Sequence, residues 1–224
     1  MTRNIVAIAA MLAVTSMVAA SVIAGSMLPE TMRLPIHWDL FGQPDRFAGK
    51  WVALLMPAGI TGMVSVLFYF LPAIEPRKEG LARSQGLYLW GWLALLLMGG
   101  VIELALLSTA FGWGIRTLHL IAGGVGVVLM LIGNQLGKSR SMYLIGLRTP
   151  WTLASEEVWI KTHRVCGKLM VAGGLAMVAT ALLPVPSGLL ATVCAAVIIL
   201  SAGVPILYSF LAWRRERSAD QASG

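Results

Sequence analysis

Six apolar stretches, separated by polar segments, constrain this chain more than any other feature of its sequence. They run from Ile5 to Leu28, Trp51 to Ile74, Leu87 to Phe111, Leu118 to Leu136, Leu169 to Leu183 and Leu189 to Trp213. About 20 apolar residues in a helix cross the hydrocarbon core of a bilayer, and only the fifth stretch is clearly shorter. Inside lipid the backbone polar groups need partners within the chain. The sequence therefore predicts an all-α, polytopic membrane protein with about six transmembrane helices.

The composition agrees with this class. Of the 224 residues, 58% are hydrophobic and 12% are charged, whereas soluble domains are about 45–50% apolar and about 25% charged. Cys166 and Cys194 are too few for a disulfide framework or a metal cluster, and we interpret both as small buried hydrophobic residues. The expected location is the cytoplasmic (inner) membrane.

The positive charge is unevenly divided between the segments that connect the apolar stretches. If the N-terminus is inside, 13 of the 17 Lys and Arg residues lie on the inner side. The other four, Arg33, Arg46, Lys50 and Arg116, lie outside. Because inner loops of membrane proteins are enriched in Lys and Arg, we predict that both termini are cytoplasmic. The net charge of +7 is then explained without direct binding of nucleic acid.

We expect three parts along the chain. Residues 1–86 form a two-span unit with an outer loop at 29–50, and residues 87–213 form a four-span unit with a cytoplasmic signature loop at 137–168. Residues 214–224 have the sequence RRERSADQASG. This polar composition predicts a disordered tail.

The signature loop combines a turn with a helix. Proline disfavours the α region for the residue before it, so Arg148-Thr149-Pro150-Trp151 should be an extended or turn element that presents Arg148 and Trp151 at the membrane surface. The nearest acidic residues to Arg148 are Glu156 and Glu157. Ser155 is a candidate helix N-cap. Glu157, Lys161, Arg164 and Lys168 then recur at spacings of four, three and four, which predicts a cytoplasmic amphipathic helix between spans four and five.

The outer loop contains residues that favour an ordered turn, namely Pro35, Gly42 and Pro44. Trp38 is then expected at the outer interface. His37 and Asp39 lie in the same loop, but their spacing is not that of a metal site and no cysteine supports one, so we expect no metal. Contact with an extracellular molecule is the alternative role.

Glu103 lies well inside an apolar stretch, where an ionisable side chain is costly and therefore a functional candidate. Its structural alternative is a carboxyl group that ties helices three and four together, with water or His119 as its partner. Asn134 either makes an interhelical hydrogen bond or shapes the signature loop. The glycine pairs at 99–100, 123–124 and 173–174 are expected to pack together.

Several of these residues also carry a family resemblance. Gly133-Asn134, IGLRTPWTL, Ser-Glu-Glu-Val-Trp, Lys-Thr-His-Arg and Gly167 resemble the Sdp immunity-protein (SdpI-like) membrane family. LPIHWDLFGQPDRFAGKW, from Leu34 to Trp51, resembles the outer loop of the domain of unknown function that often precedes that signature. Gly137 and Met142 depart from the family pattern, which has proline and asparagine there.

The resemblance implies a membrane immunity and signalling protein. It implies protection against a secreted toxic peptide outside the cell and sequestration of a small repressor protein inside. Carried onto this chain, the candidate partner-binding residues of the signature are Asn134, Arg148, Thr149, Pro150, Trp151, Glu157, Trp159, His163 and Arg164. Those of the outer loop are Pro35, His37, Trp38, Asp39, Gly42 and Pro44.

A second class of function remains open, a small transporter or channel with Glu103, His119 and Asn134 along its path. The absence of an inverted repeat and the few polar residues in the spans weigh against it. No P-loop, dinucleotide fingerprint or zincin pair occurs, so neither an enzyme nor a cofactor is expected. The sequence does not indicate an oligomeric state.

Overall fold

The computed structural model describes residues 2–39 and 41–223. Leu40, within the expected outer loop, and Gly224, within the expected tail, lie outside the described residues. Six helices are long and apolar enough to cross a membrane. They are α1 (Arg3–Met27), α2 (Lys50–Ile74), α4 (Gln85–Phe111), α5 (Thr117–Leu136), α7 (Glu156–Leu182) and α8 (Ser187–Ser223). The predicted polytopic helical architecture is confirmed.

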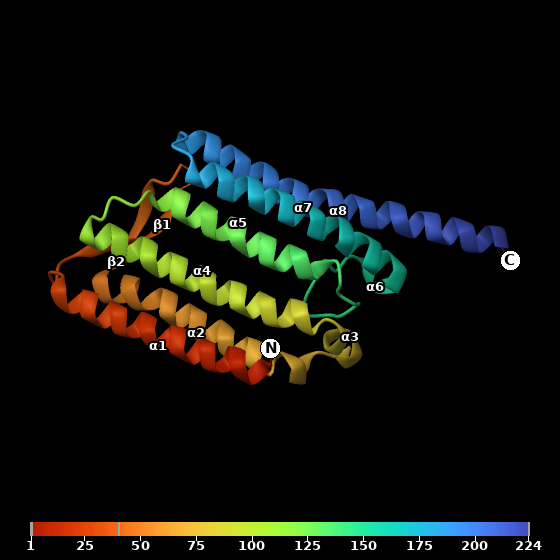
Figure 1. The fold of residues 1–224 in the computed structure, drawn as a ribbon, viewed down its shortest axis with the longest axis horizontal. Helices are drawn as coiled ribbons and strands as arrows, with labels where there is room; N and C mark the ends of the chain where they lie inside the picture. Colours follow the sequence, from red (N-terminus) through yellow and green to blue (C-terminus); the bar gives the residue numbers. More distant parts are fainter. Residues whose placement is uncertain (1, 40, 224) are drawn as a thin grey trace.

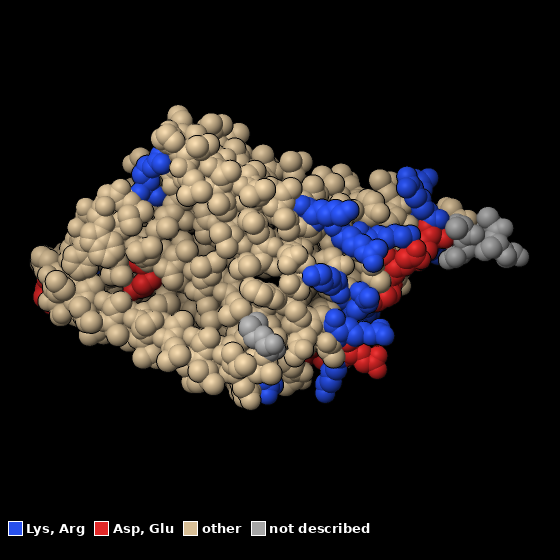
Figure 2. Space-filling model, viewed as in Figure 1, with Lys and Arg blue, Asp and Glu red and all other residues tan. Residues whose placement is uncertain are grey.

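The six helices run back and forth in sequence order (Figure 1). The pair α1 and α2 lies along one side, α4 and α5 form the middle, and α7 with α8 lies along the other side. Two short helices, α3 (Lys78–Arg83) and α6 (Pro150–Ala154), lie at one end of the bundle. Figure 2 shows most Lys and Arg side chains gathered at this same end, which we call the basic end.

The opposite end carries a structure that the helical prediction did not contain. Strands β1 (Arg33–Trp38) and β2 (Pro44–Gly49) pair antiparallel as a β-hairpin between α1 and α2. We call this the hairpin end. The Lys50 side chain, only 2% exposed, secures the hairpin base. Its Nζ donates to Gly25 O and Leu28 O at 2.7 Å each, so it caps carbonyl groups that the end of a helix leaves without partners.

Glycines bring α5 and α7 into close contact. A Cβ atom on Gly133 would lie 2.8 Å from the carbonyl oxygen of Gly167, and one on Gly167 would lie 2.5 Å from that of Gly133. Gly126 and Gly174 face each other in the same way two turns away. Any larger residue at these positions would separate the backbones.

The three glycine pairs that the sequence suggested do not form one contact. Gly99 faces Thr61 of α2, Gly124 faces Val101 of α4, and Gly173 faces Val197 of α8. Neighbouring residues on a helix point about 100° apart, so the two members of a pair serve different interfaces. The expectation that the pairs pack together was wrong.

Two boundaries differ from expectation. The amphipathic segment and span five form one continuous helix, α7, because no proline occurs between Glu156 and Leu182. The segment expected as a disordered tail continues α8 as helix to Ser223. Extending an existing helix is much easier than starting one, and Arg, Glu, Ala and Gln are good helix formers. The Ser155 hydroxyl also donates to Glu216 Oε1 at 2.8 Å, which holds this extension against α7.

Glu103 is buried between α4 and α1, and its partner is Ser21 rather than His119. The Ser21 hydroxyl oxygen lies 2.6 Å from Glu103 Oε1 and 2.7 Å from Leu54 O. A hydroxyl group carries one hydrogen and cannot donate to both acceptors at once. A protonated Glu103 that donates to Ser21, while Ser21 donates to Leu54, satisfies both distances. In this arrangement Glu103 links α1, α2 and α4.

This network predicts strong coupling between Ser21 and Glu103. Ser21→Ala should lower the free energy of unfolding by about 1–3 kcal/mol, because it leaves a buried carboxyl group without its partner. In a Glu103→Leu background the same substitution should cost much less. Thermal unfolding of the four proteins in detergent measures this cycle. Ser16→Ala, an exposed serine on α1, is the matched control. Additive effects of the two substitutions would refute the link.

The charge asymmetry predicts the orientation of the bundle. Topology reporters fused after Lys138 and after the C-terminal residue should be cytoplasmic, and a reporter fused after Pro44 should be external. The physical reason is the concentration of Lys and Arg at the basic end. A cytoplasmic signal from the Pro44 fusion would contradict the orientation.

Candidate functional site

The signature residues surround an irregular connection, residues 137–149, that joins α5 to α6 at the basic end. Glu75, directly after α2, is the anchor of this connection, and its side chain is 1% exposed. Its Oε1 accepts hydrogen bonds from Arg77 N at 2.9 Å and Tyr143 N at 3.0 Å, and its Oε2 accepts from Leu144 N at 2.8 Å. Irregular backbone needs such partners when water is excluded. The carboxylate therefore ties the first two spans to the signature.

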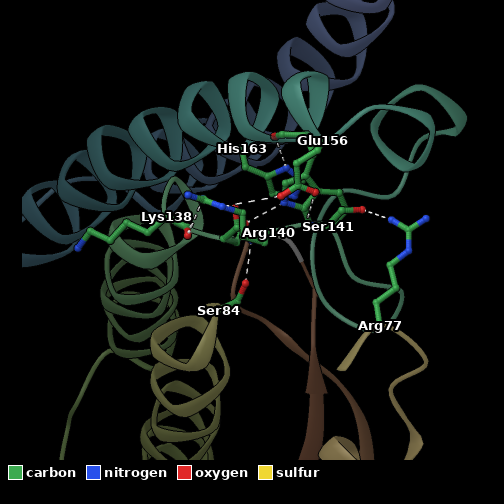
Figure 3. Close-up of polar contacts among 9 residues, drawn as sticks. Arg77, Ser84, Lys138, Arg140, Ser141, Glu156 and His163 are labelled. Atoms are coloured by element: carbon green, nitrogen blue, oxygen red, sulfur yellow. Dashed lines mark hydrogen bonds and ion pairs between the residues drawn. The ribbon is translucent and has the colours of Figure 1, made fainter. Parts of the chain in front are cut away.

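A second set of polar contacts closes over the same connection (Figure 3). The Arg77 guanidinium donates to Ser141 Oγ and lies 4.6 Å from the ring centroid of Tyr143. Arg140 N donates to Ser84 Oγ at 2.8 Å, and Arg140 Nε lies 3.8 Å from Glu156 Oε1. These contacts join α3, α4 and α7 to residues 139–143.

His163 and Trp159 hold the connection from the α7 side, and both are fully buried. The His163 ring donates from Nδ1 to Trp159 O at 2.8 Å and accepts at Nε2 from Leu147 N at 2.9 Å. One donor and one acceptor define a neutral imidazole. The Trp159 indole stacks on this ring at 4.0 Å, and its Nε1 donates to Ser139 Oγ. Gly146 has φ +117°, and a Cβ there would lie 2.8 Å from both rings.

Thr149 and Pro150 start α6. The Thr149 hydroxyl accepts from Thr152 N at 3.2 Å, and the Thr152 hydroxyl accepts from Thr149 N at 2.9 Å, which forms a capping box. Thr149 Oγ1 also lies 3.2 Å from Ser209 Oγ of α8. Trp151 packs on Phe210 of α8 with ring centroids 5.1 Å apart. The turn is therefore held against α8 by both of its ends.

The structure divides the predicted partner-binding residues into two groups. Trp159, His163 and Thr149 are buried in this structure. Trp159 and His163 lie on the face of α7 that packs on the connection, and Thr149 is the last residue of the connection itself. Arg148 is exposed, and its guanidinium donates to Tyr143 O at 2.5 Å rather than pairing with Glu156 or Glu157.

The exposed group forms a surface at the basic end. Glu157, Lys161, Arg164 and Lys168 all face outward along α7, and Lys161 pairs with Glu157 at 2.5 Å as the spacing suggested. Asn134 is exposed at a crevice of about 410 Å³ that Lys138, Arg164 and Lys168 also line. We call Arg148, Trp151 and this stripe of α7 the basic surface.

At the other end of the bundle, Asp39 organises the hairpin turn. Its Oδ1 accepts from Phe41 N at 2.9 Å and from Gln43 N at 2.8 Å. Gly42 has φ +79°, and a Cβ on it would lie 2.8 Å from Leu118 Cβ of α5. The turn thus needs both its aspartate and its glycine, and its tip rests on α5.

His37 and Asp45 connect the two strands through a 2.6 Å contact between Nδ1 and Oδ1. The hydrogen bond from His37 lowers the pKa of Asp45 from its usual value of 3.8. A carboxylate with a lowered pKa stabilises the fold above its usual pKa, and this contribution is lost as pH falls through the lowered value. The strand connection is therefore intact at neutral pH.

A cavity of about 380 Å³ opens directly beneath the hairpin. His37, Trp38 and Asp39 line its mouth. Its interior is mainly apolar and is formed by α2, α4 and α5, with Met56, Pro57, Ile60, Leu95, Met98, Ile102 and Ile121 among its lining residues. We call this the hairpin pocket. An apolar cavity with a few polar groups at its mouth is typical of a ligand site.

The sequence reasoning missed Glu75, Arg77 and Lys50 as organising residues. Arg77 and Lys50 entered only as charges that set the orientation, and Glu75 was not singled out, because the second apolar stretch was taken to end at Ile74. The segment after Glu75 carries Arg77, Lys78, Glu79 and Arg83. Its charge pattern does not distinguish the buried Glu75 from the exposed Glu79.

The three residues of the transport alternative do not come together. His119 and Asn134 lie fifteen residues apart on α5, which corresponds to about 22 Å along the helix. Glu103 bonds to Ser21 of α1 instead. The structure thus does not connect them into one path.

Comparison with known proteins matches two separate segments of this chain. Residues 138–209 match the SdpI/YfhL protein family, and residues 11–61 match a domain of unknown function, DUF1648. The chain is also similar to Immunity protein SdpI of Bacillus subtilis strain 168. The two are 28% identical over 154 residues, 69% of this chain and 70% of the relative. No solved structure matches.

Together the two matched segments cover more than half of the 224 residues. The first contains the whole hairpin, and the second contains α6, α7 and all but the first residue of the connection. The chain thus carries an SdpI/YfhL family segment preceded by a DUF1648 segment, on a multi-pass cell-membrane protein.

Proposed function

We propose that this protein is a membrane immunity protein that engages a secreted toxic peptide at the hairpin end. The observation that carries the proposal is the hairpin pocket, an apolar cavity of about 380 Å³ whose mouth is formed by the hairpin itself. The similarity to a protein named for immunity supports this choice of function. A membrane-active peptide needs apolar side chains, and these fit an apolar cavity that opens at the membrane surface.

The hairpin supplies the polar part of the proposed contact. His37 and Asp39 line the mouth of the pocket, and Phe41 at the turn is 59% exposed. An exposed aromatic residue beside a pocket is a suitable anchor for a peptide. The turn is fixed by Asp39 and Gly42, so little flexibility is lost when a peptide binds.

The second part of the proposal concerns the inner face. We infer that the basic surface sequesters a small cytoplasmic repressor when the peptide is engaged outside. Arg148 uses one guanidinium nitrogen on Tyr143 O. Its other donors are available for a carboxylate in bidentate geometry. The half-buried Trp151 lies beside Phe210 and completes an aromatic patch next to this charge.

Helix α2 connects the two faces. Met56, Pro57, Ile60 and Thr61 of α2 line the hairpin pocket. Glu75, immediately after the same helix, holds Tyr143 and Leu144 of the connection. A small displacement of α2 by a bound peptide would therefore move the anchor of the signature. This provides a physical route from toxin engagement to the basic surface.

Filling the hairpin pocket tests the outer part. Ile102→Trp should occupy the cavity and lower the tolerated concentration of toxic peptide by about tenfold or more, equivalent to about 1.4 kcal/mol of lost binding. The assay is growth of Bacillus subtilis cells that lack their own immunity protein and express each variant at equal membrane abundance. Leu104→Trp, 40% exposed on the same helix, is the matched control and should protect normally. Full protection by Ile102→Trp would refute the pocket as the site.

Arg148→Lys tests the inner part. It keeps the positive charge but loses the planar fork, so membrane abundance should stay normal while peptide-dependent recruitment of a cytoplasmic protein falls several-fold. Quantitative mass spectrometry of membranes, with and without peptide, measures both. Arg215→Lys, another exposed arginine at the basic end, should behave like the wild type. Unchanged recruitment by Arg148→Lys, or an equal loss in the control, would contradict a geometry-dependent contact.

A further inference from the structure

A crevice of about 760 Å³ lies between α1, α2 and α4 in the half of the bundle nearest the basic end. It is separate from the hairpin pocket and from the basic surface. The residues at its rim are apolar and exposed. The exposed fractions are 53% for Ile8, 62% for Met11 and 58% for Val66. Since these residues lie within membrane-spanning helices, the crevice opens toward the acyl chains of the bilayer.

Two buried hydrogen-bond donors line this apolar crevice. Ser65 is 7% exposed and Trp92 is 1% exposed. Among the described residues, neither Ser65 Oγ nor Trp92 Nε1 has a hydrogen-bond partner. The Trp92 ring is held in place by Phe68 and Tyr88, with ring centroids 6.1 and 6.2 Å away. Leaving such groups unpaired is costly. Both atoms are themselves buried, but both residues line the crevice, so an acceptor held there can pair with them after a small side-chain movement.

The mouth of the crevice has the opposite character. Asn4 and Tyr69 line it, and the Arg3 guanidinium lies 4.8 Å from the Tyr69 ring centroid. Tyr69 is four residues, or about one helical turn, from Ser65. The crevice thus presents a cation at the membrane surface, two donors about one turn deeper, and apolar walls beyond them.

We propose that this crevice is a binding site for one glycerophospholipid of the inner leaflet. The phosphate lies at Arg3 and Asn4, an ester carbonyl oxygen accepts from Ser65 and Trp92, and the acyl chain fills the apolar crevice along α1. The order of groups in the lipid, phosphate, then ester, then chain, matches the order of groups in the protein.

Each element of the site selects against other occupants. A purely apolar chain leaves both donors unpaired, and a free phosphate reaches only the mouth. The ester carbonyl is therefore the part of the lipid that makes the site specific. A bound lipid would also fix α1 against α2, the helix that carries both the hairpin pocket and Glu75.

The test compares two lipids that differ only at the proposed acceptor. Native mass spectrometry measures binding of diester phosphatidylglycerol and of its diether analogue, which lacks the carbonyl groups, to the full-length protein in detergent. Glycerol phosphate alone serves as the free-headgroup arm. Two hydrogen bonds predict that the diester binds about tenfold more tightly than the diether on the wild-type protein. Equal binding of the two lipids, or equal binding of glycerol phosphate, would overturn the proposal.

Substitutions then locate the effect. Ser65→Ala combined with Trp92→Phe keeps the crevice apolar and removes both donors, so the preference for the diester should disappear. The matched control combines Ser16→Ala with Trp90→Phe, which removes an exposed serine of α1 and an exposed tryptophan of α4. This control should keep the preference. Loss of the preference in the control, or its persistence in the first variant, would refute the assignment. The wild-type comparison decides the question even if a variant does not fold.

Discussion

Glu75 joins two parts of the chain that are far apart in sequence. Its carboxylate accepts one backbone hydrogen bond from its own segment and two from residues 143–144. In the sequence, the two spans α4 and α5 separate Glu75 from these residues. Irregular backbone beside a membrane is stable only when its polar groups have partners. Glu75 and the neutral ring of His163 supply these partners from opposite sides. The shape of the signature depends on this pair.

Most residues of the family signature therefore stabilise the local fold of the signature itself. Trp159 and His163 stack beneath the connection, Gly146 leaves room for both rings, and Thr149 starts α6 while contacting α8. The residues available to a partner are fewer, chiefly Arg148, the half-buried Trp151 and the outward stripe of α7. Most residues of the motif are thus structural, and only a few are exposed.

Helix α2 has a central place in the arrangement. Its hairpin end lines the hairpin pocket, its second half lines the crevice between α1, α2 and α4, and Glu75 follows its last turn. The Ser21–Glu103 link adds α1 and α4 to the same unit through Leu54. These three features are therefore joined by one helix.

The apolar stretches determined the number and order of the spans by themselves, since the cost of unpaired backbone in lipid leaves helices as the solution. The Glu157–Lys161 pair and the exposed stripe also followed from helical spacing alone. The tertiary structure decided the rest, because it depends on contacts between distant residues. Glu75 binds Tyr143, Ser21 binds Glu103, Lys50 binds the end of α1, and Glu216 binds Ser155. No local sequence pattern predicts which buried polar side chain will bind which distant polar group.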